Sequence, residues 1–424
     1  MNLSTAGWSS DMRAQRRRTI AAVSLGNALE WFDFVVYGFL AVTMAKLFFP
    51  PGDETASLLL VFATFGITFL MRPLGAIVLG TFADRKGRKA ALVLTITLMM
   101  LGTFTIAVAP TYSSIGIWAP IIILASRILQ GFSAGGEFGP ATTFLAEQDP
   151  ERRGFFASWQ FASQGLTTVL ATGFGFGLST LLTPAQLEAW GWRCPFIFGV
   201  LIGPIAYYIR SQLRETPEFC AASIVARPVR DLLTNQTIRL LLCIGLIVVA
   251  TITTYLTLFM PTFAIRQLGL PASAAYLAGI LSGALQVALV PVFGRLSDRY
   301  GRTPFMFAAA MVILVLIYPL FVWLVSVPET RTLLLVQGII GIVNAAYLGG
   351  LGGLICELFP TATRTSGLSI GNALAVTIFG GFAPFISAWL IAETGSKVAP
   401  SFYLMAGAII SLLALLGVRR IGFR

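Results

Sequence analysis

The chain has 424 residues, of which 56% are hydrophobic and 11% are charged, and its formal net charge is +11. Soluble domains carry about 25% charged residues, so a soluble fold of this composition would expose large apolar patches to water. The composition excludes an ordinary soluble protein. The basic residues fall in short clusters between apolar runs, which argues against a nucleic-acid-binding protein and favours a lipid bilayer as the surroundings.

Apolar stretches long enough to cross a bilayer recur along the whole chain. A hydrocarbon core needs about 20 apolar residues per helix. The predicted transmembrane helices cover residues 19–44, 57–82, 90–109, 115–146, 154–182, 193–210, 237–265, 272–296, 304–326, 332–357, 366–391 and 398–418. The sequence therefore predicts an all-α integral membrane protein with 12 transmembrane helices.

The longest polar segment, 211–236, divides these helices into two groups of six. The predicted domains are a tail at 1–18, a six-helix bundle at 19–210, a linker at 211–236, a second six-helix bundle at 237–418 and a tail at 419–424. Five basic residues fall in the loops of one side: Lys46, Arg193, Arg266, Arg331 and Lys397. Apart from two arginines within helices, the other basic residues fall on the opposite side, so both termini are predicted to be cytoplasmic.

Two loop motifs occur once in each half. The pattern G-x-x-x-D-R-x-G-R runs from Gly80 to Arg88 and again from Gly294 to Arg302. A second pattern, Glu-x-x-Pro followed by arginine, begins at Glu147 and is repeated at Glu357. Because the two motifs repeat at nearly the same offset, the sequence indicates a duplicated unit and hence two pseudo-symmetric bundles.

The duplicated loop motif resembles the signature of the major facilitator superfamily. Four further runs resemble its metabolite–proton symporter family, which includes citrate, tricarballylate, α-ketoglutarate and proline/betaine permeases. These runs are 26–34, 69–75, 127–137 and 188–193. The resemblance implies the MFS fold, transport by alternating access, and a bacterial inner membrane as the location.

Charged residues within the predicted helices gather in the first half. In helix one, Asn27, Glu30, Asp33 and Tyr37 share one face. Helix four carries Arg127 and Glu137, and helix two carries Arg72. An ionisable group at mid-membrane costs about 2.5–3.5 kcal/mol, so these groups must face each other or a wet cavity. A static network that only fastens helices is the structural alternative to a functional site.

Histidine is absent from the chain, so carboxylates are the expected proton carriers. In sugar–proton symporters, which this chain resembles at these helices, a helix-one Asp pairs with a helix-four Arg. Asp33 and Arg127 match those positions, and Arg127 would hold Asp33 ionised until a proton arrives. Glu137 and Glu30 are the alternative proton-coupling residues.

Neutral polar residues elsewhere in the helices are candidates for hydrogen bonds to a substrate, and helix packing explains each of them equally well. Together with the two arginines within the helices, they make up the expected substrate-binding residues: Arg72, Arg127, Asn27, Tyr37, Gln160, Gln164, Tyr255, Asn344, Tyr347 and Asn372.

The loop motifs are expected to gate the protein. Asp84 can lie near a helix N-terminus and hold the two halves together on the cytoplasmic side. The expected gating residues are Asp84, Arg85, Arg88, Glu147, Asp298, Arg302, Glu357 and Arg364. Charges that only set the topology are the alternative for the arginines.

These observations predict a monomeric proton-coupled symporter that takes up a small organic acid, with a di- or tricarboxylate such as citrate or tricarballylate as the expected substrate. The first alternative is a proton symporter of a zwitterionic compatible solute, proline or betaine. A membrane enzyme is the second alternative, but no nucleophile–base pair or metal-ligand pattern is evident and no cofactor is expected. A receptor would need an appended soluble domain.

Overall fold

The computed structural model describes Ser24, residues 27–28, 31–50, 52–86, 88–136, 138–211 and 228–422. For some residues within these ranges, 80–93 among them, only the backbone is described. The long helices are α3 (Glu54–Lys86), α4 (Arg88–Val108), α6 (Trp118–Ser133), α8 (Arg153–Leu181), α10 (Arg193–Ser211), α13 (Thr237–Arg266), α14 (Ala272–Tyr300), α15 (Arg302–Ser326), α16 (Thr330–Leu358), α17 (Thr361–Ala375), α18 (Ala383–Thr394) and α19 (Ala399–Arg420). Shorter helices are α2 (Ala41–Phe48), α5 (Tyr112–Ile115), α7 (Phe138–Ala146), α9 (Pro184–Gln186) and α12 (Pro228–Asn235).

Helices are the natural form for these apolar segments, because lipid offers no hydrogen-bond partners to an open backbone. In the described part, seven spans are long and apolar enough to cross a membrane, or eight if the bent pair Trp31–Phe39 and Ala41–Phe48 counts as one. Two shorter apolar helices, Leu94–Val108 and Trp118–Ser133, accompany them. Helix α8 has 29 residues and is rich in Gly, Ser, Thr and Gln. That composition suits a helix that faces protein more than lipid.

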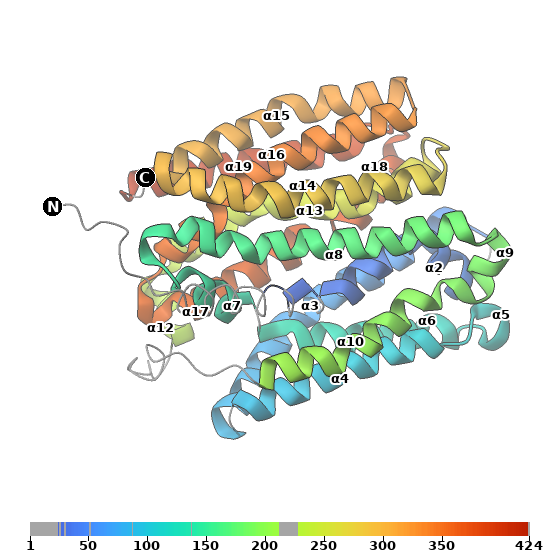
Figure 1. Cartoon of the computed structure of the whole chain (residues 1–424), viewed down its shortest axis with the longest axis horizontal. Helices are drawn as coiled ribbons and strands as arrows, with labels where there is room; N and C mark the ends of the chain where they lie inside the picture. Colours follow the sequence, from blue (N-terminus) through green and yellow to red (C-terminus); the bar gives the residue numbers. More distant parts are fainter. Residues whose placement is uncertain are drawn as a thin grey trace, which may run out of the picture.

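The helices form two groups that lie side by side (Figure 1). Helices α3, α4, α6 and α10 pack together in one group, and α13, α14, α15, α16 and α19 pack together in the other. Helix α8 runs through the middle of the view and packs along α14 of the second group. The contact between α8 and α14 is therefore a major part of the interface between the two halves.

Three predicted helices are interrupted where the sequence had suggested continuous spans. The predicted span 19–44 bends by 74° between Trp31–Phe39 and Ala41–Phe48. The span 115–146 is broken by a 3₁₀ turn at Ala134–Gly136, and 366–391 by a π-turn at Val376–Gly380. Glycines at the last two breaks have low helix propensity. In addition, the predicted linker 211–236 contains the helix α12, whereas its residues 212–227 lie outside the described part.

Helices α3 and α6 approach each other so closely that only glycine fits at their contact. A Cβ atom on Gly131 would lie 2.0 Å from the Thr68 carbonyl oxygen, and one on Gly75 would lie 1.8 Å from the Phe132 carbonyl oxygen. Small residues permit this backbone approach between membrane helices. The contact matters for function because α3 carries Arg72 and α6 carries Arg127.

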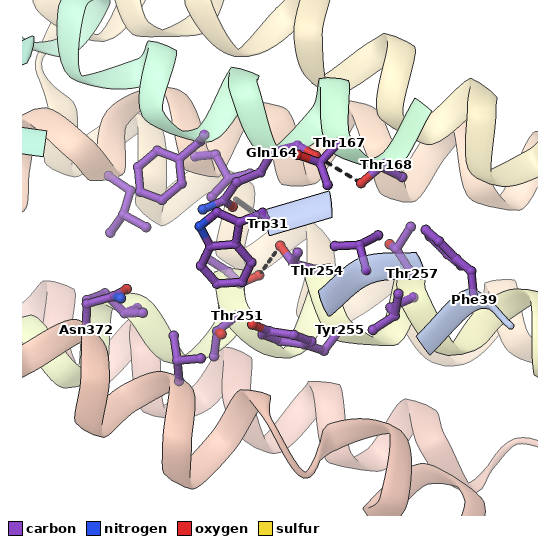
Figure 2. Close-up of a pocket in the computed structure, with 18 residues that line it drawn as sticks. Trp31, Phe39, Gln164, Thr167, Thr168, Thr251, Thr254, Tyr255, Thr257 and Asn372 are labelled. Atoms are coloured by element: carbon purple, nitrogen blue, oxygen red, sulfur yellow. Dashed lines mark hydrogen bonds between the residues drawn. The ribbon is translucent and has the colours of Figure 1, made fainter. Parts of the chain in front are cut away.

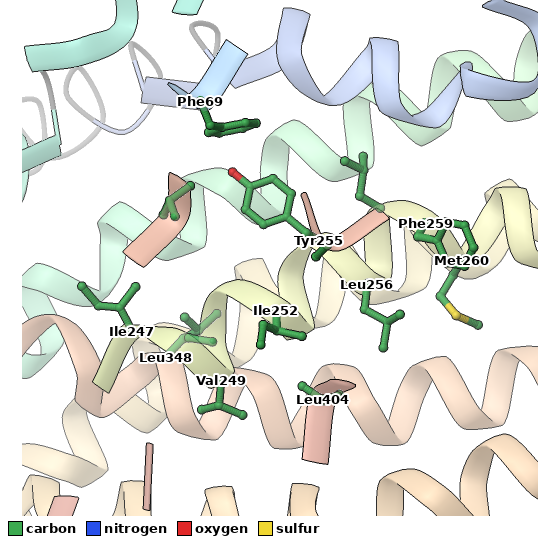
Figure 3. Close-up of a cluster of buried hydrophobic side chains, with 14 of the residues drawn as sticks. Phe69, Ile247, Val249, Ile252, Tyr255, Leu256, Phe259, Met260, Leu348 and Leu404 are labelled. Carbon is green, nitrogen blue, oxygen red and sulfur yellow. The ribbon is translucent and has the colours of Figure 1, made fainter. Parts of the chain in front are cut away.

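Aromatic side chains join the two groups near the centre of the protein. Tyr255 of α13 points toward Phe69 of α3 (Figure 3), and their ring centroids are 5.3 Å apart at an interplanar angle of 81°. Phe65 of α3 contacts the same tyrosine ring at 5.9 Å. Edge-to-face pairs of this kind contribute about 0.5–1.5 kcal/mol each beyond area burial. They close one side of the cavity described next.

Candidate functional site

A cavity lies between the two groups of helices (Figure 2). Its volume is about 70 Å³, which accommodates about five water molecules. The helix Trp31–Phe39 and α8 supply one wall, and α13, α16 and α17 supply the other. The cavity is therefore shared by the first and second halves of the chain.

Amide and hydroxyl side chains supply most of the polar lining. They are Gln164, Thr167 and Thr168 on α8, Thr251, Thr254 and Thr257 on α13, and Asn372 on α17. The α13 threonines recur every three residues and so share one helix face. Several of these hydroxyls donate to their own helix, as Thr254 does to the Ala250 carbonyl at 2.9 Å, which leaves their oxygen lone pairs for a ligand or water.

Arg72 lies directly behind the cavity wall. Its Cζ is 4.4 Å from the Trp31 ring centroid and 4.4 Å from that of Phe69, and Trp31 itself lines the cavity. The residue is only 5% exposed, and its Nε has no hydrogen-bond partner among the residues that the structure describes. No acidic side chain among the described residues forms an ion pair with Arg72. Aromatic faces stabilise a guanidinium by about 0.5–2 kcal/mol, but within the described part of the chain no acidic side chain compensates its charge.

Arg127 and Asp33 are both buried, and two neutral side chains connect them. Arg127 Nη1 donates to Gln130 Oε1 at 2.7 Å, and Gln130 Nε2 donates to Thr103 Oγ1 at 2.9 Å. Thr103 Oγ1 in turn donates to Asp33 Oδ2. The expected direct pair is therefore an indirect one, connected through Gln130 of α6 and Thr103 of α4. Glu30 and Glu137, the alternative carriers, lie outside the described residues.

Other residues expected to bind substrate form hydrogen bonds away from the cavity lining. Asn27 and Gln160 bind each other, with Gln160 Nε2 donating to Asn27 Oδ1 at 3.0 Å. Tyr37 lies 2.7 Å from Thr64 Oγ1, and the Tyr347 hydroxyl donates to the Leu246 carbonyl at 2.7 Å. Asn344 is buried, and its Oδ1 has no partner in the described part of the chain. Of the neutral candidates, only Gln164, Tyr255 and Asn372 line the cavity.

Asp298 joins the two halves at one end of the protein. Its carboxylate accepts from the backbone N–H groups of Gly154 at 2.8 Å and Phe155 at 2.9 Å, in the first turn of α8. These N–H groups have no partner within the helix, and the helix dipole favours a negative charge there. Arg302 binds Asp298 at 2.9 Å and also pairs with Glu357.

A second ion pair at the same end connects Arg364 with Glu147 at 3.1 Å, and Arg364 Nε donates to the Cys356 carbonyl at 2.9 Å. Asp84, Arg85 and Arg88 lie at the junction of α3 and α4, where only the backbone is described. At the opposite end, Arg266 of α13 pairs with Glu54 of α3. Sequence reasoning missed that pair, because the two residues fall outside the predicted spans, in different predicted loops that share no motif.

Sequence reasoning also missed Thr103 and the cavity threonines Thr167, Thr168 and Thr257. Thr168 could have been found, because it follows Gln164 by four residues and must share its face. Thr103 gave no such signal, since it is a single hydroxyl in an apolar helix whose sequence does not indicate which neighbour it faces.

Two groups of membrane-spanning helices share a cavity that carries several polar side chains, and ion pairs lie at both ends of the protein. This arrangement is that of a membrane transport protein. The chain matches the family described as "Sugar (and other) transporter" over residues 19–226 and "Major Facilitator Superfamily" over residues 242–421. It is 40% identical over 402 residues to a citrate–proton symporter of Klebsiella pneumoniae, covering 93% of this chain and 90% of that protein. It is 35% identical over 414 residues to a proline/betaine transporter of Escherichia coli K12, covering 94% and 82%. The chain belongs to the major facilitator superfamily, as one of its metabolite–proton symporters.

Solved structures support the same fold. A D-xylose–proton symporter superimposes with a TM-score of 0.73 at 18% identity, covering 94% of this chain and 96% of that one. A proton:xylose symporter bound to 6-bromo-6-deoxy-D-glucose gives a TM-score of 0.77 at 16% identity, covering 96% of each. The predicted fold of 12 transmembrane helices in two six-helix bundles is confirmed. The protein is a multi-pass membrane transporter that works by alternating access, and its family consists of transporters and not enzymes.

Proposed function

We propose that this transporter takes up a small organic acid together with protons, and that its substrate is a di- or tricarboxylate such as citrate or tricarballylate. One observation carries the choice of an anion. The guanidinium of Arg72 is buried behind the ring of Trp31, which lines the cavity, and it has no acidic partner among the described residues. The 40% identity to a citrate–proton symporter supports the same choice.

The physical reason is the cost of uncompensated charge at mid-membrane. An anion that enters a low-dielectric cavity needs a fixed cation, and the described residues of the cavity lining are all neutral. Arginine suits a carboxylate because its planar fork can donate two parallel hydrogen bonds. Arg72 would contact the carboxylate at the edge of Trp31, while Gln164, Tyr255 and Asn372 would bind the remaining oxygens.

Asp33 is the proposed proton carrier, with Arg127 as its coupled cation. While Asp33 is ionised, the hydrogen-bonded chain through Thr103 and Gln130 holds the Arg127 guanidinium. A proton on Asp33 removes the negative charge, so Arg127 becomes able to attract an anion. Carboxylate binding should therefore strengthen as pH falls, until the substrate itself takes up protons. Glu137 and Glu30 remain the alternatives.

A zwitterionic compatible solute is the second candidate. Its supporting observation is the aromatic part of the lining, in which Trp31 and Tyr255 offer ring faces to a quaternary ammonium group. The 35% identity to a proline/betaine transporter points the same way. Such a ligand would depend on these rings and much less on the two arginines.

Binding to the purified protein separates the two candidates. Citrate, tricarballylate and α-ketoglutarate are expected to raise the Tm, and their affinity to increase from neutral to mildly acidic pH, whereas proline and betaine have no effect. In Arg127→Gln the carboxylates should bind more weakly and with little pH dependence. Saturable binding of the zwitterions alone, unchanged in Arg127→Gln, would contradict the carboxylate assignment and support the osmolyte one.

We further propose that the protein acts as a monomer in a bacterial inner membrane, with both termini in the cytoplasm and the Asp298 end facing it. The arginine-rich loops at that end support the orientation. The proposed cytoplasmic gate consists of Asp84, Arg85, Arg88, Glu147, Asp298, Arg302, Glu357 and Arg364. It stabilises the state in which this end is closed.

Asp298→Ala should open this gate more often, because the first turn of α8 loses its charged acceptor and Arg302 loses a partner. Cys356 lies at the gate and is only 1% exposed, so its thiol reports opening. Loss of hydrogen bonds to a charged group predicts about tenfold faster labelling of Cys356 by a membrane-impermeant thiol reagent. The acceleration should appear in inside-out vesicles and not in right-side-out ones.

Asp298→Asn serves as the matched control, since asparagine can still accept from the helix N-terminus; it should accelerate labelling far less. Replacement of Cys194, Cys220 and Cys243 by serine isolates the Cys356 signal. Acceleration only in right-side-out vesicles would reverse the proposed orientation, and equal labelling of Asp298→Ala and the parent protein would exclude Asp298 from the gate.

A further inference from the structure

Three hydrogen bonds run in one direction from Arg127 to Asp33. The distances are 2.7 Å from Arg127 Nη1 to Gln130 Oε1 and 2.9 Å from Gln130 Nε2 to Thr103 Oγ1, and Thr103 Oγ1 then donates to Asp33 Oδ2. Gln130 and Thr103 are completely buried. Protein side chains therefore carry the whole connection between the two charges.

The direction of this chain follows from Arg127, because a guanidinium can only donate. Gln130 must turn its carbonyl oxygen to Arg127, which leaves its NH₂ group for Thr103. The Thr103 oxygen then accepts from Gln130, and its single hydrogen is free for Asp33. The arrangement is complete only when the last member of the chain is an acceptor, as an ionised carboxylate is.

Thr103 has a second acceptor within reach. Its Oγ1 lies 3.1 Å from the Met99 carbonyl oxygen of its own helix. A hydroxyl has one hydrogen and two lone pairs, so it can donate to Asp33 or to Met99 but not fully to both. The hydroxyl thus has two positions that differ by a rotation about one bond.

Few charged or titratable groups surround the Thr103–Asp33 hydrogen bond in the described part of the chain. Arg127 approaches Asp33 from α6. Tyr37 lies on the same helix as Asp33, and its ring centroid is 3.7 Å from Arg127 Cζ. Arg72 Cζ of α3 lies 5.0 Å from the ring centroid of Phe34, the residue that follows Asp33. From α10, the backbone at Gly199 packs against Asp33 Oδ1, which has no hydrogen-bond partner among the described residues. The Thr103 side is thus the hydrogen-bonded side of the carboxylate.

We propose that the Thr103 hydroxyl is a two-position switch that transmits the protonation state of Asp33 to Arg127 through Gln130. The proposal rests on the proposed role of Asp33 as proton carrier. With Asp33 ionised, both ends of the chain are charge-assisted, and bonds in such a chain strengthen one another. When Asp33 gains a proton on Oδ2, its O–H donates to Thr103 Oγ1, and the threonine donates to Met99 instead. The chain of hydrogen bonds from Arg127 then no longer ends on a charged acceptor, and its hold on Arg127 weakens.

Thr103→Val tests the switch, because valine keeps the shape of threonine and removes the hydroxyl. The assay is uptake of radiolabelled citrate into proteoliposomes under a pH gradient, with betaine as the probe if wild type binds only zwitterions. Loss of a hydrogen bond to a charged group predicts about a tenfold lower accumulation ratio. The KM for the probe should also lose its dependence on pH, which a purely structural role would not change.

Thr105→Val is the matched control. It makes the same substitution on the same helix, at a hydroxyl whose one hydrogen bond within the described part goes to the Leu101 carbonyl, and it should behave as wild type. Thr103→Ser keeps the hydroxyl and should restore both the accumulation and the pH profile. If Thr103→Val does not yield folded protein, Gln130→Met interrupts the same chain and carries the same expectation.

Asp33→Asn, measured in parallel, separates the two proposals. Full accumulation by Asp33→Asn would overturn the role of Asp33 and the switch with it. Loss of accumulation in Asp33→Asn, together with a wild-type ratio and pH profile in Thr103→Val, would overturn the switch alone. Loss in both, with recovery in Thr103→Ser, is the result that the proposal expects.

Discussion

Asp33→Asn is expected to abolish proton-driven accumulation of substrate while leaving part of the counterflow exchange intact. Asparagine cannot exchange a proton near neutral pH, and the chain contains no histidine to take over. Exchange moves substrate without net proton movement, so it does not need the titratable group. Reconstituted protein under an imposed pH gradient should then equilibrate its substrate and not concentrate it.

Asp53→Asn is a suitable control, because Asp53 is an exposed carboxylate that accepts from Thr55 N–H at 2.8 Å, a bond that asparagine can replace. It should accumulate substrate as wild type does. If Asp33→Asn still concentrates substrate, Asp33 is not the carrier, and Glu137 or Glu30 takes its place as the residue to test.

Arg72→Gln is expected to weaken the binding of a carboxylate substrate by about 10- to 100-fold, which corresponds to about 1.5–3 kcal/mol for a hydrogen bond to a charged group. Glutamine keeps a polar side chain beside Trp31 and Phe69 but removes the cation. Arg72→Lys keeps the charge without the planar fork and should fall between the two. Calorimetric titration with citrate at fixed pH measures the change.

Arg331→Gln removes one positive charge at an exposed position at the start of α16, so it controls for the change in net charge. Its affinity for citrate should stay within twofold of wild type, as surface substitutions usually do. Equal citrate affinities for Arg72→Gln and wild type would mean that Arg72 only fastens α3 to the Trp31 helix. A loss of affinity for betaine as large as that for citrate would point to collapse of the cavity.

Much of the architecture was predictable because hydropathy and repetition are local properties of a chain. Apolar stretches of membrane-spanning length can only be helices, whatever their neighbours. The loop motif repeated at Asp84 and Asp298 revealed the duplication without any tertiary information. The bend at Leu40 and the breaks near Gly135 and Gly380 were harder to predict, because a glycine in a membrane helix can serve close packing as well as a break.

The amino-acid sequence by itself determined that this is a helical membrane transporter whose mid-helix charges Asp33, Arg72 and Arg127 lie in the first half. Only the tertiary structure decided which polar side chains face the cavity and which bind a neighbouring helix. Gln160 and Gln164 share one face of α8, yet the first binds Asn27 and the second lines the cavity. Likewise, the hydrogen bonds that connect Asp33 with Arg127 run through Thr103 and Gln130. The reason is that helix periodicity gives the direction of a side chain, whereas its partner depends on how far each neighbouring helix is shifted along its axis.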